Sequence, residues 1–264
     1  MERRQFLTAS MAAAALGVAG KASAQESAKS AREYYRIEKY TLQNGQQTKL
    51  TETYLNDALI PALARRGMGP VGAFALSIGP ETPTYYVLIP GPDPAAMAKL
   101  ELDLSADDDF VKSAKPFWAA PAAAPAFLRV EISLLAAFEG WPKLTPPPSS
   151  ATKARRIFQL RTYEGPSFQA HVDKVKMFHS GEFEIFAKAG FHMVFFGDTL
   201  VGSRMPNLTY MLSFEDSTEL DARWKLFSND PTWKKLSADP RFAYEPIVSN
   251  ITNLVLNPLA SSQI

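Results

Sequence analysis

Alternating and helical hydrophobic patterns follow one another in the same order in both halves of the chain. In the first half, a strand pattern at residues 36–41 precedes a helical pattern over residues 49–66, with apolar side chains at close to 3.6-residue spacing. Strands near residues 71–78 and 84–89 follow, then a second helical region over 94–115 and a last strand over 127–135. This order is typical of a split βαβ unit.

The second half repeats the order at an offset of 123 residues. The landmark pairs are Tyr40 and Tyr163, Gly67 and Gly190, Phe110 and Trp233, Ile132 and Val255, and, with a drift of one residue, Tyr86 and Tyr210. Self-similarity at a fixed period is a signature of duplication. The pattern therefore predicts an α+β protein of two tandem ferredoxin-like βαββαβ repeats, each with an antiparallel sheet covered by helices on one face.

Composition shifts divide the chain further. A proline-rich stretch that includes Pro146, Pro147 and Pro148 is typical of a stiff connection between domains. The expected divisions are a signal peptide at 1–24, a flexible N-terminus at 25–32, a first repeat at 33–139, a linker at 140–154, a second repeat at 155–258 and a tail at 259–264.

The period-two pattern of the strand at residues 157–163 assigns its side chains to two faces. We expect Phe158, Leu160 and Thr162 on the helix side, with Gln159, Arg161 and Tyr163 on the other face. In the first half, Arg36, Glu38 and Tyr40 occupy equivalent positions on that other face. Two such faces would close into a small barrel with tyrosine and arginine inside, where a ligand could bind. An open sheet with polar residues facing solvent fits the pattern equally well.

Composition excludes several classes of protein. The chain has no cysteine, which excludes disulfides, thiolate metal sites and a cysteine nucleophile. The 28 basic and 27 acidic residues give no electrostatic reason to expect a nucleic acid partner. Gly-x-Ser-x-Gly, Walker and dinucleotide-binding motifs are absent from the sequence. The three histidines do not have metal-ligand spacing, and we expect no metal site and no membrane span after the N-terminus.

The N-terminus predicts the location of the protein. Arg3 and Arg4 are followed by Phe6 and Leu7, an apolar stretch and the small residues 22–24, which together resemble a twin-arginine export signal. Cleavage after Ala24 would remove three basic groups and one acidic group, leaving a net charge of −1. We therefore expect a periplasmic or secreted protein that is exported after folding.

Candidate functional residues come mainly from the second half. On the helical pattern at 167–189, an apolar stripe of residues 168, 172, 175, 183 and 186 includes His179, which we expect to face the sheet or a cavity. Arg161 and Tyr163 could bind a carboxylate or a carbonyl oxygen, and with His179 they form the candidate catalytic group. The candidate ligand-binding residues are Glu38, Tyr40, His192, Tyr210 and Trp224.

Each of these residues also has an ordinary structural interpretation. His179 fits a partly buried histidine with one hydrogen bond, and Arg161 fits an ion pair with Glu38 or Glu164. Trp224 fits the core that anchors a helix. We expect His171 to be solvated.

Several segments of the second half together resemble the NIPSNAP family. They are Arg161-Thr162-Tyr163, the run from Met205 to Leu212, Phe214-Glu215-Asp216, Arg223-Trp224, and Asp230-Pro231-Thr232-Trp233. The resemblance covers most of residues 155–258, and the first half resembles the same domain only in outline. It implies the dimeric α/β-barrel fold, closed within one chain as a pseudodimer or between chains of a homo-oligomer, and it implies no particular reaction.

Two functions are consistent with these observations. The first is an exported protein that binds a small organic molecule in a barrel cavity, with monooxygenase-like or haem-related chemistry as its finer variants. On this hypothesis the ligand lies between the sheet and helices of the second repeat, near Arg161, Tyr163 and His179. The second is a non-catalytic periplasmic interaction protein. The sequence identifies no cofactor.

Overall fold

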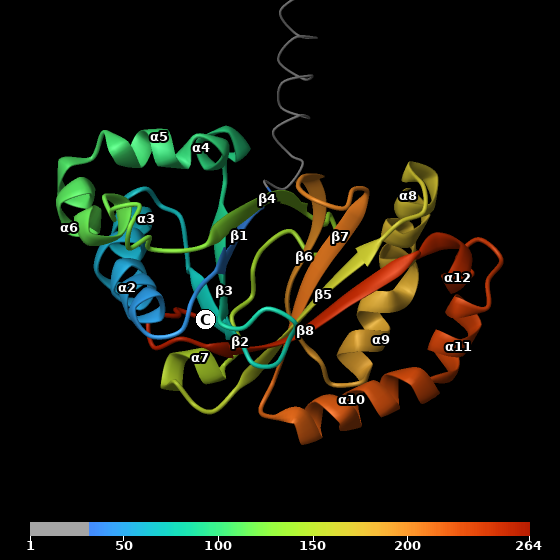
Figure 1. Cartoon of the computed structure of the whole chain (residues 1–264). Coiled ribbons are helices and arrows are strands. Elements are labelled where there is room, and N and C mark those ends of the chain that lie inside the picture. The colour runs from blue at the N-terminus through green and yellow to red at the C-terminus, as the bar shows by residue number, and fades with distance from the viewer. Residues whose placement is uncertain (1–31) are drawn as a thin grey trace, which may run out of the picture.

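Eight antiparallel strands form a closed barrel within one chain (Figure 1). The computed structural model describes residues 32–264, apart from the side chains of Tyr244 and Glu245, so the expected signal peptide lies outside the described residues. The strands are β1 (Tyr34–Thr41), β2 (Gly72–Leu76), β3 (Thr84–Gly91), β4 (Arg129–Ala137), β5 (Ile157–Glu164), β6 (His192–Val201), β7 (Asn207–Phe214) and β8 (Asn250–Pro258). Their order around the barrel is β1-β3-β2-β8-β5-β7-β6-β4.

The helices cover the outside of the barrel, those of the first repeat on one side and those of the second on the other (Figure 1). The first group is α2 (Gln46–Tyr54), the π-helical segment η1 (Leu55–Leu59), α3 (Ile60–Arg65), α4 (Pro94–Ala98), α5 (Leu100–Ser105) and α6 (Asp108–Trp118). The second group is α8 (Phe168–Met177), the π-helical segment η2 (Phe178–Glu182), α9 (Phe183–Lys188), α10 (Ser217–Asn229), α11 (Pro231–Ser237) and α12 (Tyr244–Ile247). A short helix, α7 (Ser149–Thr152), lies in the connection between them. In the described part of the chain, the helices lack the length and apolar character needed to cross a membrane.

Strand pairing confirms the two-repeat α+β fold and its intrachain pseudodimer. Each repeat contributes four strands in the same order, and the pairs β2–β8 and β4–β6 join the two sheets into the barrel. Gly67 and Gly190 end equivalent helices with positive φ angles of 67° and 79°, a conformation that costs other residues more than glycine. The 123-residue offset therefore reflects matching backbone geometry.

Two of the expected landmark pairs were wrong in register. Tyr40 lies opposite Tyr85, and Tyr163 lies opposite Leu208, so the third strands keep the offset of 123 without a drift. Tyr86 packs with the barrel interior, whereas Tyr210 packs beneath the helices. On the last strands, Ile132 lies opposite Glu38 and its equivalent is Asn253 opposite Arg161, two residues before Val255.

The expected assignment of strand faces was also wrong. Phe158 and Leu160 point into the barrel, where they join an apolar core, and Tyr163 lies on the outer face beneath the helices. The other buried members of that core are Tyr35, Phe74, Leu76, Leu88, Leu135, Ala137, Leu144, Val194, Phe195, Met211, Leu256 and Ile264. Strand alternation shows that neighbours point to opposite faces, but it does not show which face closes the barrel. An eight-stranded barrel is just wide enough to be filled by side chains, so its interior takes the apolar set.

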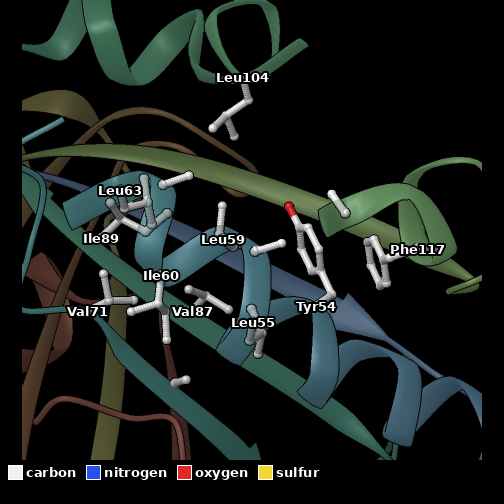
Figure 2. Packing of buried hydrophobic residues seen from close by; sticks show 14 of the residues in the cluster. Tyr54, Leu55, Leu59, Ile60, Leu63, Val71, Val87, Ile89, Leu104 and Phe117 are labelled. Carbon is white, nitrogen blue, oxygen red and sulfur yellow. The ribbon is translucent and has the colours of Figure 1, made fainter. Parts of the chain in front are cut away.

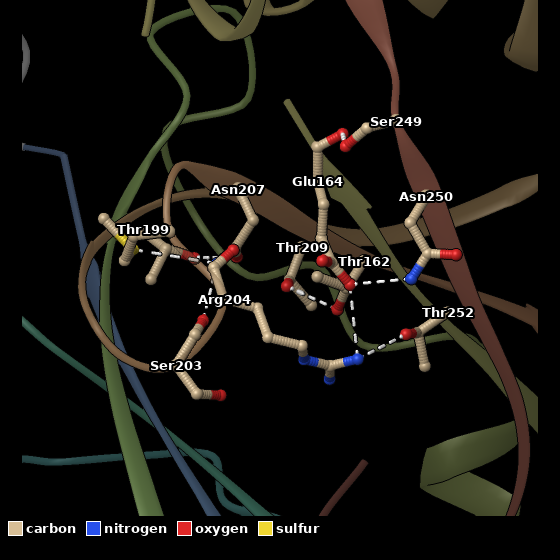
Figure 3. A network of polar contacts seen from close by, with 11 residues as sticks. Thr162, Glu164, Thr199, Ser203, Arg204, Asn207, Thr209, Ser249, Asn250 and Thr252 are labelled. Carbon is tan, nitrogen blue, oxygen red and sulfur yellow. Dashed lines mark hydrogen bonds and ion pairs between the residues drawn. The ribbon is translucent and has the colours of Figure 1, made fainter. Parts of the chain in front are cut away.

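One end of the barrel carries a polar network (Figure 3). Arg204 donates hydrogen bonds to Glu164 and Thr252, and the hydroxyls of Thr162 and Thr209 lie 2.8 Å apart. Asn207 supports the β6–β7 turn, because its amide nitrogen donates to the carbonyls of residues 203 and 204. A small cavity of about 110 Å³ at this end is lined by Thr162, Arg204, Asn207, Thr209, Thr252 and their neighbours.

Candidate functional site

A cavity of about 380 Å³ lies between the sheet and helices of the first repeat. Strands β1 and β4 form its floor, η1 forms one wall, and α5 and α6 cover it. It is lined by Glu38, Tyr40, Tyr54, Leu59, Leu100, Glu101, Leu104, Phe117, Trp118, Phe127, Val130 and Ile132. Most of these side chains are apolar, so the polar groups on the floor determine how a ligand could be oriented.

The polar floor consists of a buried carboxylate held by two neighbours. Arg36 donates from Nε to Glu38 at 2.7 Å, and the Tyr40 hydroxyl donates to the other oxygen of Glu38. Arg36 also donates to the Met97 carbonyl at 2.7 Å and forms an ion pair with Glu101 at the helix side. Burial alone would lower the pKa of Arg36, but the two carboxylates raise it above its ordinary value. Arg36 therefore stays charged between Glu38 and Glu101.

Two tyrosine hydroxyls, one on the floor and one on α2, add neutral hydrogen-bonding groups to the cavity lining. Burial, followed by the nearby Glu38 carboxylate, raises the pKa of both Tyr40 and Tyr54, so both phenols stay protonated at neutral pH. The Tyr54 hydroxyl accepts from Trp118 Nε1 at 3.2 Å, which leaves its own proton available for another acceptor. Figure 2 shows the Tyr54 ring beside that of Phe117, and the two rings stack with their centroids 4.0 Å apart.

The equivalent layer of the second repeat is packed with rings. Arg161 donates to the Tyr163 hydroxyl at 3.0 Å, and that hydroxyl lies 2.9 Å from the hydroxyl of Tyr210. The Arg161 guanidinium also stacks over Trp224, with its carbon 4.4 Å from the ring centroid. Phe186, Phe191 and Phe227 pack around Trp224. The structure thus brings Arg161, Tyr163, Tyr210 and Trp224 together, as expected, but in a packed core rather than inside the barrel.

The expected ion pairs of Arg161 with Glu38 or Glu164 do not form. Glu38 belongs to the first repeat and pairs with Arg36, and Glu164 pairs with Arg204 at the barrel end. A buried ion pair that sequence analysis missed lies nearby instead. Lys174 Nζ is 2.8 Å from Glu182 Oε2, and both side chains are 2% exposed. Burial raises the pKa of Glu182, although Lys174 and Arg161 act in the opposite direction.

His179 does not lie where its stripe predicted. Phe168 and Val172, which belong to that stripe, are 72% and 44% exposed, and the buried face of α8 instead includes His171, Lys174 and Met177. His179 is itself exposed and lines a surface basin of about 480 Å³. Phe183 and Phe186 of the same stripe do pack in the core of the second repeat, so its members are divided between two faces. Between the two groups, η2 interrupts the regular helix after Met177, with Gly181 at a φ of 122°.

Both ring nitrogens of His179 are occupied. Nδ1 lies 2.9 Å from the Val175 carbonyl oxygen and therefore donates, while Nε2 accepts from the Gly140 backbone N–H at 3.0 Å. A neutral imidazole has one donor and one acceptor nitrogen, and this arrangement uses both. To act as a base or a ligand, His179 would first have to break one of these bonds.

The other two histidines also lie in the second repeat. His171 was expected to be solvated, but it is 8% exposed, and its Nε2 lies 2.7 Å from Asp198 Oδ1. His192 begins β6, and burial lowers its pKa despite hydrogen bonds with the backbone of residues 145 and 146. The described residues contain no group of three or more histidines and carboxylates arranged to hold a metal ion.

Of the expected ligand-binding residues, Glu38 and Tyr40 line the first-repeat cavity, whereas Tyr210 and Trp224 belong to the packed second repeat. Sequence reasoning missed Tyr54, Glu101 and Trp118, which come from three separate helices. Asp107 caps α6 by accepting from the Phe110 backbone N–H, a local contact. The approach of α5 and α6 to the sheet depends on tertiary packing and has no such local signal in the sequence.

Comparison with known proteins separates the two repeats. Residues 158–263 match the family model described as NIPSNAP. The second repeat is thus similar to the NIPSNAP domain, and we call it the NIPSNAP repeat. The NIPSNAP match covers less than half of the chain and leaves the first repeat, with its cavity, outside it. No protein with a curated description matches the chain in sequence.

Solved structures that cover most of the chain share its fold. A protein of Lactobacillus acidophilus proposed to be a monooxygenase has a TM-score of 0.55 at 11% identity, covering 86% of this chain and 94% of that one. A protein of Fusobacterium nucleatum, also proposed to be a monooxygenase, has a TM-score of 0.53 at 11% identity, covering 87% and 94%. An anthrone oxidase-like protein has a TM-score of 0.51 at 10% identity, covering 88% and 93%. At these identities the similarity shows the α/β-barrel fold alone.

Proposed function

We propose that the protein binds a small organic molecule in the cavity between the sheet and the helices of its first repeat. The observation that carries this proposal is the cavity itself, in which an apolar lining of about 380 Å³ surrounds a buried carboxylate already fixed by Arg36 and Tyr40. Concave, mainly apolar sites with a few fixed polar groups are the usual form of small-molecule sites. The proposal assigns the ligand to the first repeat rather than to the NIPSNAP repeat.

The dense packing of the NIPSNAP repeat supports a ligand site in the first repeat instead. Phe178, Phe186 and Tyr210 fill the layer between its sheet and helices, and each is fully buried. Phe178 and Phe186 pack against each other and against Tyr210. A ligand there would have to displace these rings, whereas the first repeat already provides a space.

Monooxygenase-like chemistry is a finer hypothesis for the same cavity. Its support is the likeness to folds described as proposed monooxygenases, together with a carboxylate and two phenols at the cavity floor. Haem-related chemistry through a histidine does not fit, because the described lining contains no histidine and His171, His179 and His192 lie in the second repeat. Export through a twin-arginine signal is proposed on the N-terminal sequence alone.

Binding of the neutral fluorescent probe N-phenyl-1-naphthylamine tests the proposal. Ile132 is 43% exposed on β4 and lines the cavity, so Ile132→Tyr narrows the cavity with little change to the buried core. Val201→Tyr is the matched control, because Val201 is 64% exposed on β6 and is not among the lining residues. We expect 1:1 binding to the wild type and to Val201→Tyr, and about tenfold weaker binding to Ile132→Tyr, an affinity ratio that corresponds to about 1.4 kcal/mol.

Two results would overturn the proposal. One is wild-type protein that is folded by circular dichroism but does not bind the probe. The other is equal binding by the two tyrosine variants, which would place the probe elsewhere. If the protein acts instead as a periplasmic interaction partner, the cavity substitution Ile132→Tyr leaves the recovery of that partner unchanged.

A further inference from the structure

Aromatic side chains surround the acidic floor of the first-repeat cavity. The five rings belong to Tyr40, Tyr54, Phe117, Trp118 and Phe127. Tyr40 meets Phe117 and Phe127 edge-on, with centroid distances of 6.1 and 6.2 Å. The lining therefore holds aromatic rings in several orientations, both stacked and edge-on, around one space.

The charged groups at this cavity carry a net negative charge. Among the described lining residues, the charged side chains are Glu38 and Glu101, and one guanidinium, that of Arg36, pairs with both of them. Glu38 is 3% exposed, so water screens its charge little. Glu101 is half-exposed at the cavity and extends the acidic surface outward.

The second repeat shows what this layer of the fold accommodates. At the offset of 123 residues, Arg161 stands in the place of Glu38, and its guanidinium stacks on Trp224. The ammonium of Lys174 lies 4.5 Å from the centroid of the Phe178 ring and 5.4 Å from that of Tyr163. The second repeat thus places two of its own cations against aromatic rings, in the layer that is hollow in the first repeat.

From these observations we propose that the ligand of the first repeat is an organic cation, an amine or a quaternary ammonium with apolar substituents. The inference rests on the proposed function and specifies the chemistry of its ligand. The negative faces of aromatic rings attract a cation, and this attraction grows when water is excluded. Glu38 and Glu101 carry one negative charge more than Arg36 balances, and this net charge neutralises the ligand while Arg36 holds Glu38 in place. A neutral molecule of the same shape gains only the apolar contacts.

Two probes of the same shape separate the contribution of charge to the binding affinity from that of shape. Phenyltrimethylammonium and tert-butylbenzene differ by one atom, a charged nitrogen in place of a carbon. In displacement of N-phenyl-1-naphthylamine from the wild-type protein, we expect the cation to bind about tenfold more tightly than its neutral counterpart. Sodium chloride should weaken binding of the cation and leave that of tert-butylbenzene unchanged.

Substitution of one carboxylate tests the role of the acidic floor. Glu101→Gln changes a half-exposed residue, so the variant should fold, and we expect its affinity for the cation to fall about threefold with no change for tert-butylbenzene. The matched control is Glu131→Gln, because Glu131 is 51% exposed on β4 and pairs with Lys39 outside this cavity. Its affinities for both probes should equal those of the wild type.

The outcomes distinguish the inference from the proposed function. If the naphthylamine probe binds wild type but tert-butylbenzene displaces it as well as the cation does, the cation inference is refuted and the small-molecule site stands. An equal effect of Glu101→Gln on both probes also refutes the inference. If the naphthylamine probe does not bind wild type, the proposed function itself fails.

Discussion

Replacing Lys174 by methionine should strongly destabilise the second repeat. The pair of Lys174 and Glu182 is 2% exposed on both sides, with 2.8 Å between the charged atoms. The substitution keeps an unbranched side chain of similar length but leaves the Glu182 carboxylate buried without this ion pair. Removing one partner of a buried pair costs about 3–5 kcal/mol of the free energy of unfolding.

The loss should depend on pH, because Glu182 can take up a proton. Burial raises its pKa in the folded protein, and Lys174 opposes that rise, so the substitution raises the pKa further. A carboxyl group whose folded pKa lies above its unfolded value binds a proton more tightly in the folded state. Its stabilising contribution is complete below the unfolded pKa, near 4.3, and is lost as pH rises through the folded pKa. We therefore expect the loss of free energy of unfolding in the Lys174→Met variant to be larger at pH 8 than at pH 5.

Urea unfolding followed by circular dichroism at pH 5 and pH 8 measures this effect. Lys176→Met is the matched control, because Lys176 lies on the same helix, is 60% exposed and should contribute less than about 1 kcal/mol through its pair with Asp173. The double variant Lys174→Met with Glu182→Leu removes both charges and should recover most of the loss. A single variant that loses less than about 1 kcal/mol at pH 8, or a double variant as unstable as the single one, would refute the reasoning.

Three further predictions address the candidate histidine, the chemistry and the location. His179→Ala should leave probe binding in the first-repeat cavity unchanged and lower thermal stability, because it removes the bonds to residues 140 and 175; weakened binding would contradict this expectation. On the monooxygenase-like hypothesis, purified protein consumes oxygen with an activated phenol in an oxygen-electrode assay, and Ile132→Tyr slows the reaction; no consumption by wild type would leave that hypothesis without support. In a host with twin-arginine export, the intact mass of the periplasmic protein should correspond to a chain that begins at Gln25. Replacing Arg3 and Arg4 by lysine should keep the protein in the cytoplasm, whereas unchanged export of that variant would exclude the twin-arginine route.

The elements of the fold could be predicted from periodicity, because hydrophobic spacing and helix-ending glycines such as Gly67 are local signals. The assignment of side chains to the two faces of the strands could not be predicted from periodicity. The alternation around Arg161 is the same whether it points into the barrel or toward the helices, and only closure of the eight strands decides between them. The stripe that included His179 failed because its members do not share one face: Phe168 and Val172, before the π-helical segment, are exposed, whereas Phe186, after it, is buried. The π-helical segment between them changes the register of the helix.

The candidate site was predictable only in part. Glu38 and Tyr40 were found because they share one strand face with period two. Tyr54, Glu101 and Trp118 approach that face from helices far apart in the sequence, so their meeting depends on tertiary packing. The position of the cavity in the first repeat, rather than the second, depends on side-chain volume, because Phe178, Phe186 and Tyr210 fill in one repeat what remains open in the other.

The closure of the barrel within a single chain has a consequence for how the two halves could change. In a symmetric pair of identical subunits, every substitution occurs twice, so a change that fills one interior also fills the other. Here each position is encoded once per half, and Glu38 and Arg161 could take opposite charges at equivalent places. One half can therefore become a rigid support while the other keeps room for a ligand. Two identical subunits related by an exact twofold axis could not specialise in this way.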